Sequence, residues 1–139
     1  LGQLACYRDA ERVWSLIEGV DSQGGQWAAS QDPHELESIQ CCIVSGEFAV
    51  AENGAVWLTD DVIPQRAALF ITQHLVLVVP ASELVHNMHE AYARLSFDEA
   101  RFGIFISGPS KTADIEQSLV IGAHGARSLT VLFVADSAT

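Results

Sequence analysis

Short apolar runs alternate with turn residues through the middle of the chain. Residues 42–45, 48–51 and 55–58 are rich in β-prone side chains, and two groups of turn residues, Ser45-Gly46-Glu47 and Glu52-Asn53-Gly54, separate them. The second group is typical of a tight hairpin. Two short connections in succession therefore predict an antiparallel meander attached to a larger sheet.

Longer apolar runs follow in the second half of the chain. Residues 74–80 are almost wholly apolar, which indicates a strand buried on both faces, and residues 103–106 and 129–134 have the same character. With helical segments between them, these runs predict a parallel βαβαβ unit over residues 75–134 with right-handed crossovers. Such sheets bind ligands beyond the carboxyl ends of their strands.

The first part of the chain predicts a helix and a linker. Apolar positions recur at roughly helical spacing over residues 5–19, and Gly19 is placed to end that helix. Residues 21–31 are rich in Gly, Ser and Gln and indicate an exposed linker. Asp32-Pro33-His34-Glu35 is then a compact helix start. We therefore divide the chain into an N-terminal helix and linker, residues 1–31, and an α/β domain, residues 32–139.

The clearest helical stripe lies at residues 82–95. Ser82 is the expected N-cap, and Glu90 and Arg94 are spaced to pair on the exposed side. The apolar face of this predicted helix contains Leu84, Val85, Met88, Ala91, Tyr92 and Leu95.

Residues 104–124 predict a strand that leads through a polar loop into another helix. Ser110 or Thr112 can cap this helix and Gly122 can end it, and the helix start beside Lys111 favours an anion site. The loop is not a nucleotide-binding P-loop, because Pro109 and Ser110 stand where that motif needs glycine directly before the lysine.

The segment Ser107-Gly-Pro-Ser-Lys-Thr-Ala-Asp-Ile-Glu116, followed by Gly122-Ala-His-Gly125 and a strand, resembles the signature of the LUD-domain family, in its lactate utilisation protein C (LutC/YkgG) group. Residues 51–54 and 66–74 also resemble the family, although Thr72-Gln73 replaces prolines that its members often carry. The resemblance implies an α/β fold, three-layer with a mostly parallel sheet plus an antiparallel hairpin region, like that of the coenzyme A transferase, sugar-phosphate isomerase and formyltetrahydrofolate cyclo-ligase group.

The candidate site is centred on the 107–114 loop. Lys111 and its neighbours could form an anion site or simply the N-terminus of a helix. Asp114 and Glu116 could have acid–base or structural roles. His124 could carry a proton or stabilise a turn. The predicted ligand-binding residues are Ser107, Gly108, Ser110, Lys111, Thr112, Asp114, Glu52, Gly54 and His124.

Glu52 has two interpretations. In coenzyme A transferases a glutamate at a comparable glycine-flanked strand end is the nucleophile, so the resemblance makes Glu52 a catalytic candidate beside Glu116 and His124. A turn residue needs no such role, and we favour the turn interpretation. His34, His86 and His89 are too scattered to indicate a metal site, and none is predicted.

Charge narrows the set of partners. The chain has 7 basic and 18 acidic residues and a net charge of −11, which disfavours nucleic acid and anionic membrane surfaces. No apolar run is long enough to span a bilayer. We expect a cytoplasmic protein, since no leader segment is recognisable.

The cysteines and the resemblance together set the functional expectation. Cys6, Cys41 and Cys42 have neither a disulfide framework nor cluster-binding spacing, so no cofactor is predicted. The resemblance implies a non-cluster subunit or accessory protein that works with iron–sulfur and oxidoreductase proteins in oxidising L-lactate to pyruvate, binding a small carboxylate or phosphate. The alternative is an acyl-transfer or ligase-type enzyme that uses Glu52 or Glu116 with Lys111.

Overall fold

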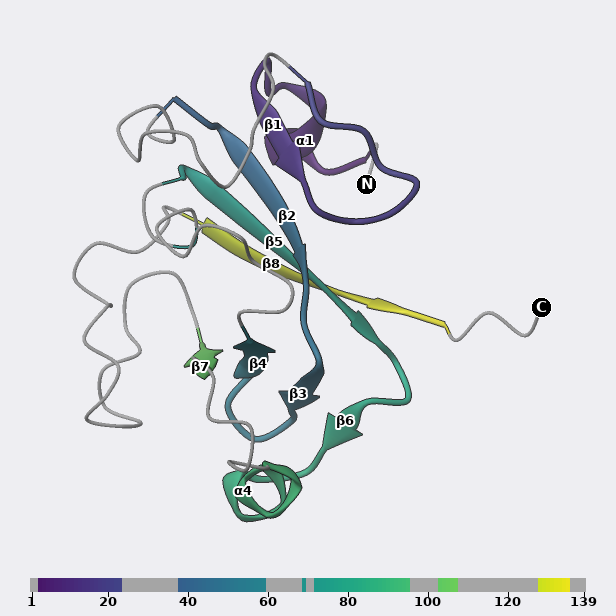
Figure 1. Ribbon diagram of the computed structural model, residues 1–139, viewed down its shortest axis with the longest axis vertical. Coiled ribbons are helices and arrows are strands. Elements are labelled where there is room, and N and C mark those ends of the chain that lie inside the picture. Colours follow the sequence, from purple (N-terminus) through teal and green to yellow (C-terminus); the bar gives the residue numbers. More distant parts are fainter. Residues whose placement is uncertain are drawn as a thin grey trace.

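The computed structural model describes residues 3–23, 38–59, 69, 72–95, 103–107 and 128–135. These residues form two four-stranded sheets that pack face to face, with a short helix outside each (Figure 1). The parallel sheet has the order β1-β2-β5-β8, and its strands are β1 (Val13–Ser15), β2 (Cys41–Ser45), β5 (His74–Pro80) and β8 (Ser128–Val134). The mixed sheet has the order β6-β3-β4-β7, and its strands are β6 (Leu84–Val85), β3 (Phe48–Val50), β4 (Val56–Thr59) and β7 (Gly103–Ile106). The predicted α/β class, with a mostly parallel sheet and an antiparallel hairpin region, is confirmed.

Side-chain alternation explains why the two sheets stack. In β4, Val56 and Leu58 point into the space between the sheets, while Trp57 points to the other side. In β2, Cys42 faces the mixed sheet and Cys41 faces the outside of the parallel sheet. Each sheet therefore has two apolar faces, and the layers continue outward to α1 (Ala5–Arg8) on one side and α4 (Met88–Arg94) on the other.

The core between the sheets is mainly aliphatic, with Trp14 of β1 as its buried aromatic residue, while the layer under α4 is rich in aromatic side chains. Phe105 lies at the centre of that outer layer, with its ring centroid 4.7 Å from that of Trp57, 6.1 Å from Phe48 and 6.0 Å from Tyr92. Arg94 of α4 lies over the Phe48 ring and forms an ion pair with Glu83. Gly103 packs directly on the Trp57 indole, where any larger residue would meet the ring.

The predicted meander is only half correct. Strands β3 and β4 form the antiparallel hairpin, but β2 does not pair with β3. The chain instead turns at Gly46 from the parallel sheet into the mixed sheet. Gly46 donates its N–H to the Val78 carbonyl at 2.9 Å, and a side chain there would run into Val56. The first of the two tight turns thus joins different sheets, and only the second joins the strands of a hairpin.

The predicted helix over residues 5–19 is wrong beyond its first turn. It ends at Arg8, and Val13–Ser15 form β1, which pairs in parallel with β2. The apolar pair Val13 and Trp14 is buried on the two faces of this strand, and that alternation had been taken for helical spacing. Of the predicted linker, Gln23 forms a β-bridge with Val13.

The predicted helix over residues 82–95 starts too early. Leu84 and Val85 form β6, which pairs in parallel with β3, and the helix begins only at Met88. Asn87 is the N-cap, because its Oδ1 accepts the Glu90 N–H at 2.9 Å while the Glu90 carboxylate accepts the His86 N–H at 2.8 Å. Glu90 is therefore engaged at the helix start, and Arg94 pairs with Glu83 instead of Glu90.

The predicted parallel βαβαβ unit is also wrong at its middle strand. Strand β7 pairs antiparallel with β4 in the mixed sheet, whereas β5 and β8 are direct parallel neighbours over seven residue pairs. The predicted helix start at residues 32–35 lies outside the described residues, as does the helix expected after residue 110. The division at residue 31 stays a prediction.

Candidate functional site

The turn between β3 and β4 is the corner of the mixed sheet where the three described site residues, Glu52, Gly54 and Ser107, come together. Gly54 has a φ of +75°, a conformation that favours glycine, and its N–H donates to the Val50 carbonyl at 2.9 Å. The Asn53 side chain accepts the Ala55 N–H at 2.9 Å and closes the turn. The Asn-Gly pair thus forms the tight turn that the sequence predicts.

Ser107 reaches this turn from the far end of β7. Its hydroxyl donates to the Asn53 carbonyl at 2.7 Å, although the two residues are 54 positions apart. The register of β4 with β7, which pairs Val56 with Ile106, brings them together. The first residue of the predicted anion loop therefore touches the turn that carries Glu52 and Gly54. Because the Ser107 hydroxyl donates its hydrogen to the Asn53 carbonyl, its oxygen can still accept a hydrogen bond from a ligand.

Glu52 is held by the start of α4. Its N–H donates to the His86 carbonyl at 3.1 Å, and its carboxylate accepts the N–H of Met88, the first residue of the helix, at 3.2 Å. A carboxylate at this place satisfies a free amide and interacts favourably with the helix dipole. This contact gives Glu52 a structural role and agrees with the turn interpretation. Its ligand-binding and catalytic roles stay predictions.

The other predicted site residues lie outside the described part of the chain, and their roles stay predictions. They are Gly108, Ser110, Lys111, Thr112, Asp114, Glu116 and His124.

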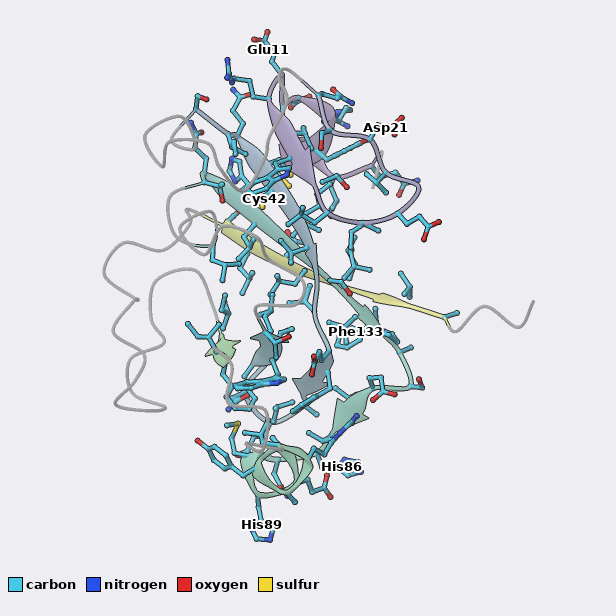
Figure 2. All side chains as sticks on the ribbon, in the orientation of Figure 1. Glu11, Asp21, Cys42, His86, His89 and Phe133 are labelled. Carbon is cyan, nitrogen blue, oxygen red and sulfur yellow. The ribbon has the colours of Figure 1, made fainter. Side chains whose placement is uncertain are left out.

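An apolar pocket of about 220 Å³ adjoins the turn. Its lining combines residues of the mixed sheet with residues of the edge strand β8, and the exposed side chains of Leu84 and Phe133 form part of its wall. Phe133 is labelled in Figure 2. Its lining residues are Ala49, Val50, Ala51, Gly54, Leu84, Val131 and Phe133. Among the residues that the structure describes, Gly54 is the predicted site residue that lines this pocket. The pocket suits a small apolar group beside the polar turn.

A second, polar cleft of about 440 Å³ was missed by the sequence reasoning. It lies at the amino ends of the parallel strands, where His74 Nδ1 and Ser128 Oγ are 2.7 Å apart. Its lining residues are Ala5, Cys6, Asp9, Ala10, Gln40, Gln73, His74 and Ser128. The sequence did contain a signal for this cleft, because His74 and Ser128 each stand directly before an apolar run. Parallel pairing places the first residues of neighbouring strands together at the same end of the sheet.

The histidines of the α4 region point away from both sheets. Figure 2 shows His86 and His89 directed outward from this helix, and both are exposed. Among the residues that the structure describes, no three His, Cys, Asp or Glu side chains are arranged to hold a metal ion. Within the same residues, no helix combines the length and the apolar character needed to cross a membrane.

Burial raises the pKa of two cysteine thiols, Cys41 and Cys42. It raises the pKa of the Cys41 thiol to about 12, with a further contribution from Cys6, and it raises the pKa of Cys42 still more. Both thiols are therefore protonated at neutral pH.

Residues 16–134 match the LUD domain, and the chain belongs to the LUD-domain family. It is 32% identical to lactate utilization protein C of Bacillus pumilus over 123 residues, which cover 84% of this chain and 51% of that protein. It is 34% identical to lactate utilization protein C of Shouchella clausii over 107 residues, or 73% of this chain and 47% of that protein. The chain spans about half the length of the curated relatives that it matches.

A solved structure shares the fold. The crystal structure of a DUF162 family protein from Deinococcus radiodurans has a TM-score of 0.62 and 21% sequence identity, covering 90% of this chain and 75% of that chain. At this identity the likeness shows the fold alone. Neither curated relative described above is named as a transferase or a ligase, so the enzyme alternative gains no support from them.

Proposed function

We propose that this chain is the LUD-domain part of a lactate utilisation protein, a non-cluster accessory protein of a system that oxidises L-lactate to pyruvate. The observation that carries the proposal is the match to relatives named lactate utilization protein C, two of which cover about three quarters or more of this chain at over 30% identity. The protein works in the cytoplasm, beside iron–sulfur and oxidoreductase proteins that carry the electrons.

The ligand is a small carboxylate or phosphate bound by the loop of residues 107–114. The contact between Ser107 and Asn53 supports this assignment, because it fixes the start of that loop on a rigid hairpin turn. The apolar pocket beside Gly54 supports it further, because a small organic acid has an apolar part as well as a charged one. Lys111 is the only lysine in the chain and supplies the positive charge.

Thermal unfolding with lactate, pyruvate or phosphate tests the ligand assignment. A ligand that binds only the folded chain raises its stability by about 2.7 kcal/mol at a hundredfold excess over Kd. We expect Lys111→Ala to lose this stabilisation and to keep the ligand-free Tm. Arg8→Ala is the matched control, because it removes one positive charge at an exposed position and should keep the stabilisation. Equal stabilisation of all three proteins would remove Lys111 from the site.

Co-purification tests the accessory role. The tagged chain, co-expressed with a cysteine-rich iron–sulfur protein of L-lactate oxidation, should retain that protein and its visible cluster absorbance. It should also increase lactate-dependent reduction of an artificial electron acceptor. Absence of both effects would contradict the accessory role, while binding of coenzyme A with acyl exchange would replace it with the enzyme alternative.

A further inference from the structure

Two thiols from distant parts of the chain meet on the outer face of the parallel sheet. Cys6 lies in α1 and Cys41 is the first residue of β2, and the Cys6 thiol is near enough to contribute to the raised pKa of Cys41. Both belong to the apolar cluster that packs α1 on the sheet, together with Val13, Ile43 and Val76. The contact is therefore part of the α1 docking surface.

Strand geometry separates this pair from the third cysteine. Successive side chains of a strand point to opposite faces, so Cys41 faces α1 while Cys42 faces the core between the two sheets. Figure 2 labels Cys42 beside β2. Although Cys41 and Cys42 are adjacent in sequence, only Cys41 contacts the cluster that contains Cys6.

The two thiols of the pair differ in their access to solvent. Cys6 is partly exposed and lines the polar cleft of about 440 Å³ next to His74 and Ser128. Cys41 is fully buried behind it. A small oxidant in the cleft can therefore reach Cys6 more readily than the buried Cys41.

We propose that Cys6 and Cys41 form a peroxide-sensitive dithiol that closes to an intramolecular disulfide. The Cys6 sulfur attacks the O–O bond of a peroxide and becomes a sulfenic acid, while the peroxide is reduced to water or an alcohol. The Cys41 sulfur then attacks the Cys6 sulfur, the S–O bond breaks, and the leaving oxygen takes the Cys41 proton as water. The two thiols are oxidised by two electrons, and a dithiol reductant reverses the reaction.

The disulfide ties α1 to β2. The helix has only four residues and no side-chain N-cap, so its packing on the sheet holds it in place. A covalent bond between Cys6 and Cys41 makes that docking permanent and fixes one wall of the polar cleft. Burial, with a contribution from Cys6, raises the pKa of the Cys41 thiol to about 12, so we expect its attack on the oxidised Cys6 to be the slower step.

Mapping of the disulfide after mild hydrogen peroxide treatment of the folded chain tests the proposal. Under denaturing conditions the treated protein should titrate one thiol per chain instead of the three present in the reduced protein. Trypsin should release the peptide that ends at Arg8 linked to the peptide that begins at Val13 and contains both remaining cysteines. Dithiothreitol should restore all three thiols.

Variants identify the partner and the order of reaction. Cys42→Ala should form the link as the native chain does, while Cys41→Ala should lose it and accumulate a Cys6 sulfenic acid that dimedone labels. If Cys41→Ala does not fold, peptide fragmentation of the native chain and the Cys42→Ala result still locate the bond. A bond from Cys6 to Cys42, disulfide-linked dimers, or three thiols surviving treatment would each overturn the proposal.

Discussion

The two faces of the mixed sheet carry different side chains although they share the same strands. The inner face, toward the parallel sheet, is aliphatic and almost fully buried, as Leu58 and Val56 show. The outer face carries the aromatic side chains of Phe48, Trp57 and Phe105; Trp57 is partly exposed, and Tyr92 of the covering helix α4 is 43% exposed. We therefore expect the inner face to contribute more to stability, and the layer under α4 to be the one that opens locally next to the candidate site.

Leu58→Ala should have the largest effect on stability. Leu58 is 1% exposed, and removing its side chain leaves a cavity between the sheets that should cost about 3 kcal/mol of unfolding free energy. Urea denaturation measures the change. Leu95→Ala is the matched control on the outer face, where a half-buried side chain should cost only about 1 kcal/mol. Equal losses would mean that the two faces are not energetically different.

Phe105→Leu should have the next largest effect. The substitution keeps an apolar side chain but removes the ring contacts with Phe48, Trp57 and Tyr92, which should cost roughly 1.5 kcal/mol. Phe133→Leu is the control, because its ring is 49% exposed and lies outside this cluster, and it should leave the urea midpoint nearly unchanged. If Phe105→Leu left the urea midpoint unchanged, the ring contacts would add no stability beyond the burial of apolar surface.

Asn87→Ala should destabilise α4, the helix that packs on the outer face of the mixed sheet. The Asn87 side chain accepts the Glu90 N–H, and losing this cap should cost about 1 kcal/mol. Amide hydrogen exchange should then speed up in α4 more than in β5. Asn87→Asp keeps an acceptor and should behave as the native chain does, so unchanged exchange in Asn87→Ala would exclude the cap as a determinant of α4 stability.

Ser107→Ala should give the smallest measurable loss. It removes the hydrogen bond to the Asn53 carbonyl, and the expected cost is about 0.7 kcal/mol because that carbonyl can bond to water instead. Thr59→Ala removes an exposed hydrogen bond to Glu47 and should cost less. If Ser107→Ala left both stability and anion binding unchanged, the link between the hairpin turn and the predicted anion loop would have no consequence.

Local sequence patterns predict where strands and turns occur better than they predict which strands pair with each other. The alternation in residues 55–58, the Asn53-Gly54 turn and the apolar run of residues 74–80 each specify a structure from near neighbours in sequence. The pairing of β7 with β4 could not be predicted, because an apolar strand fits either sheet and its choice depends on distant contacts. Leu84 and Val85 were misassigned for a related reason, since pairing with β3 outweighs their helical spacing.

The candidate site was predictable only in part. Glu52 and Gly54 were found from turn chemistry and family resemblance, and Ser107 from the motif, but their convergence depends on strand register. Glu52's contact with Met88 depends on where α4 starts, which the position of Asn87 decides. The polar cleft had a signal in His74 and Ser128, which each precede an apolar run, but joining them also requires that β5 and β8 be direct parallel neighbours.

The parallel register of β5 with β8 has a consequence for how the molecule tolerates change. His74 and Ser128 are joined at one end of the β5–β8 ladder, and the Ala81 N–H closes the other end on the Val134 carbonyl at 2.7 Å. A shift of one residue would turn every side chain of β8 to the wrong face. The chain leaves the parallel sheet at Pro80 and returns to it at Ser128. Changes of length in the connections between β6, α4 and β7 should therefore leave the alignment of β5 with β8 intact.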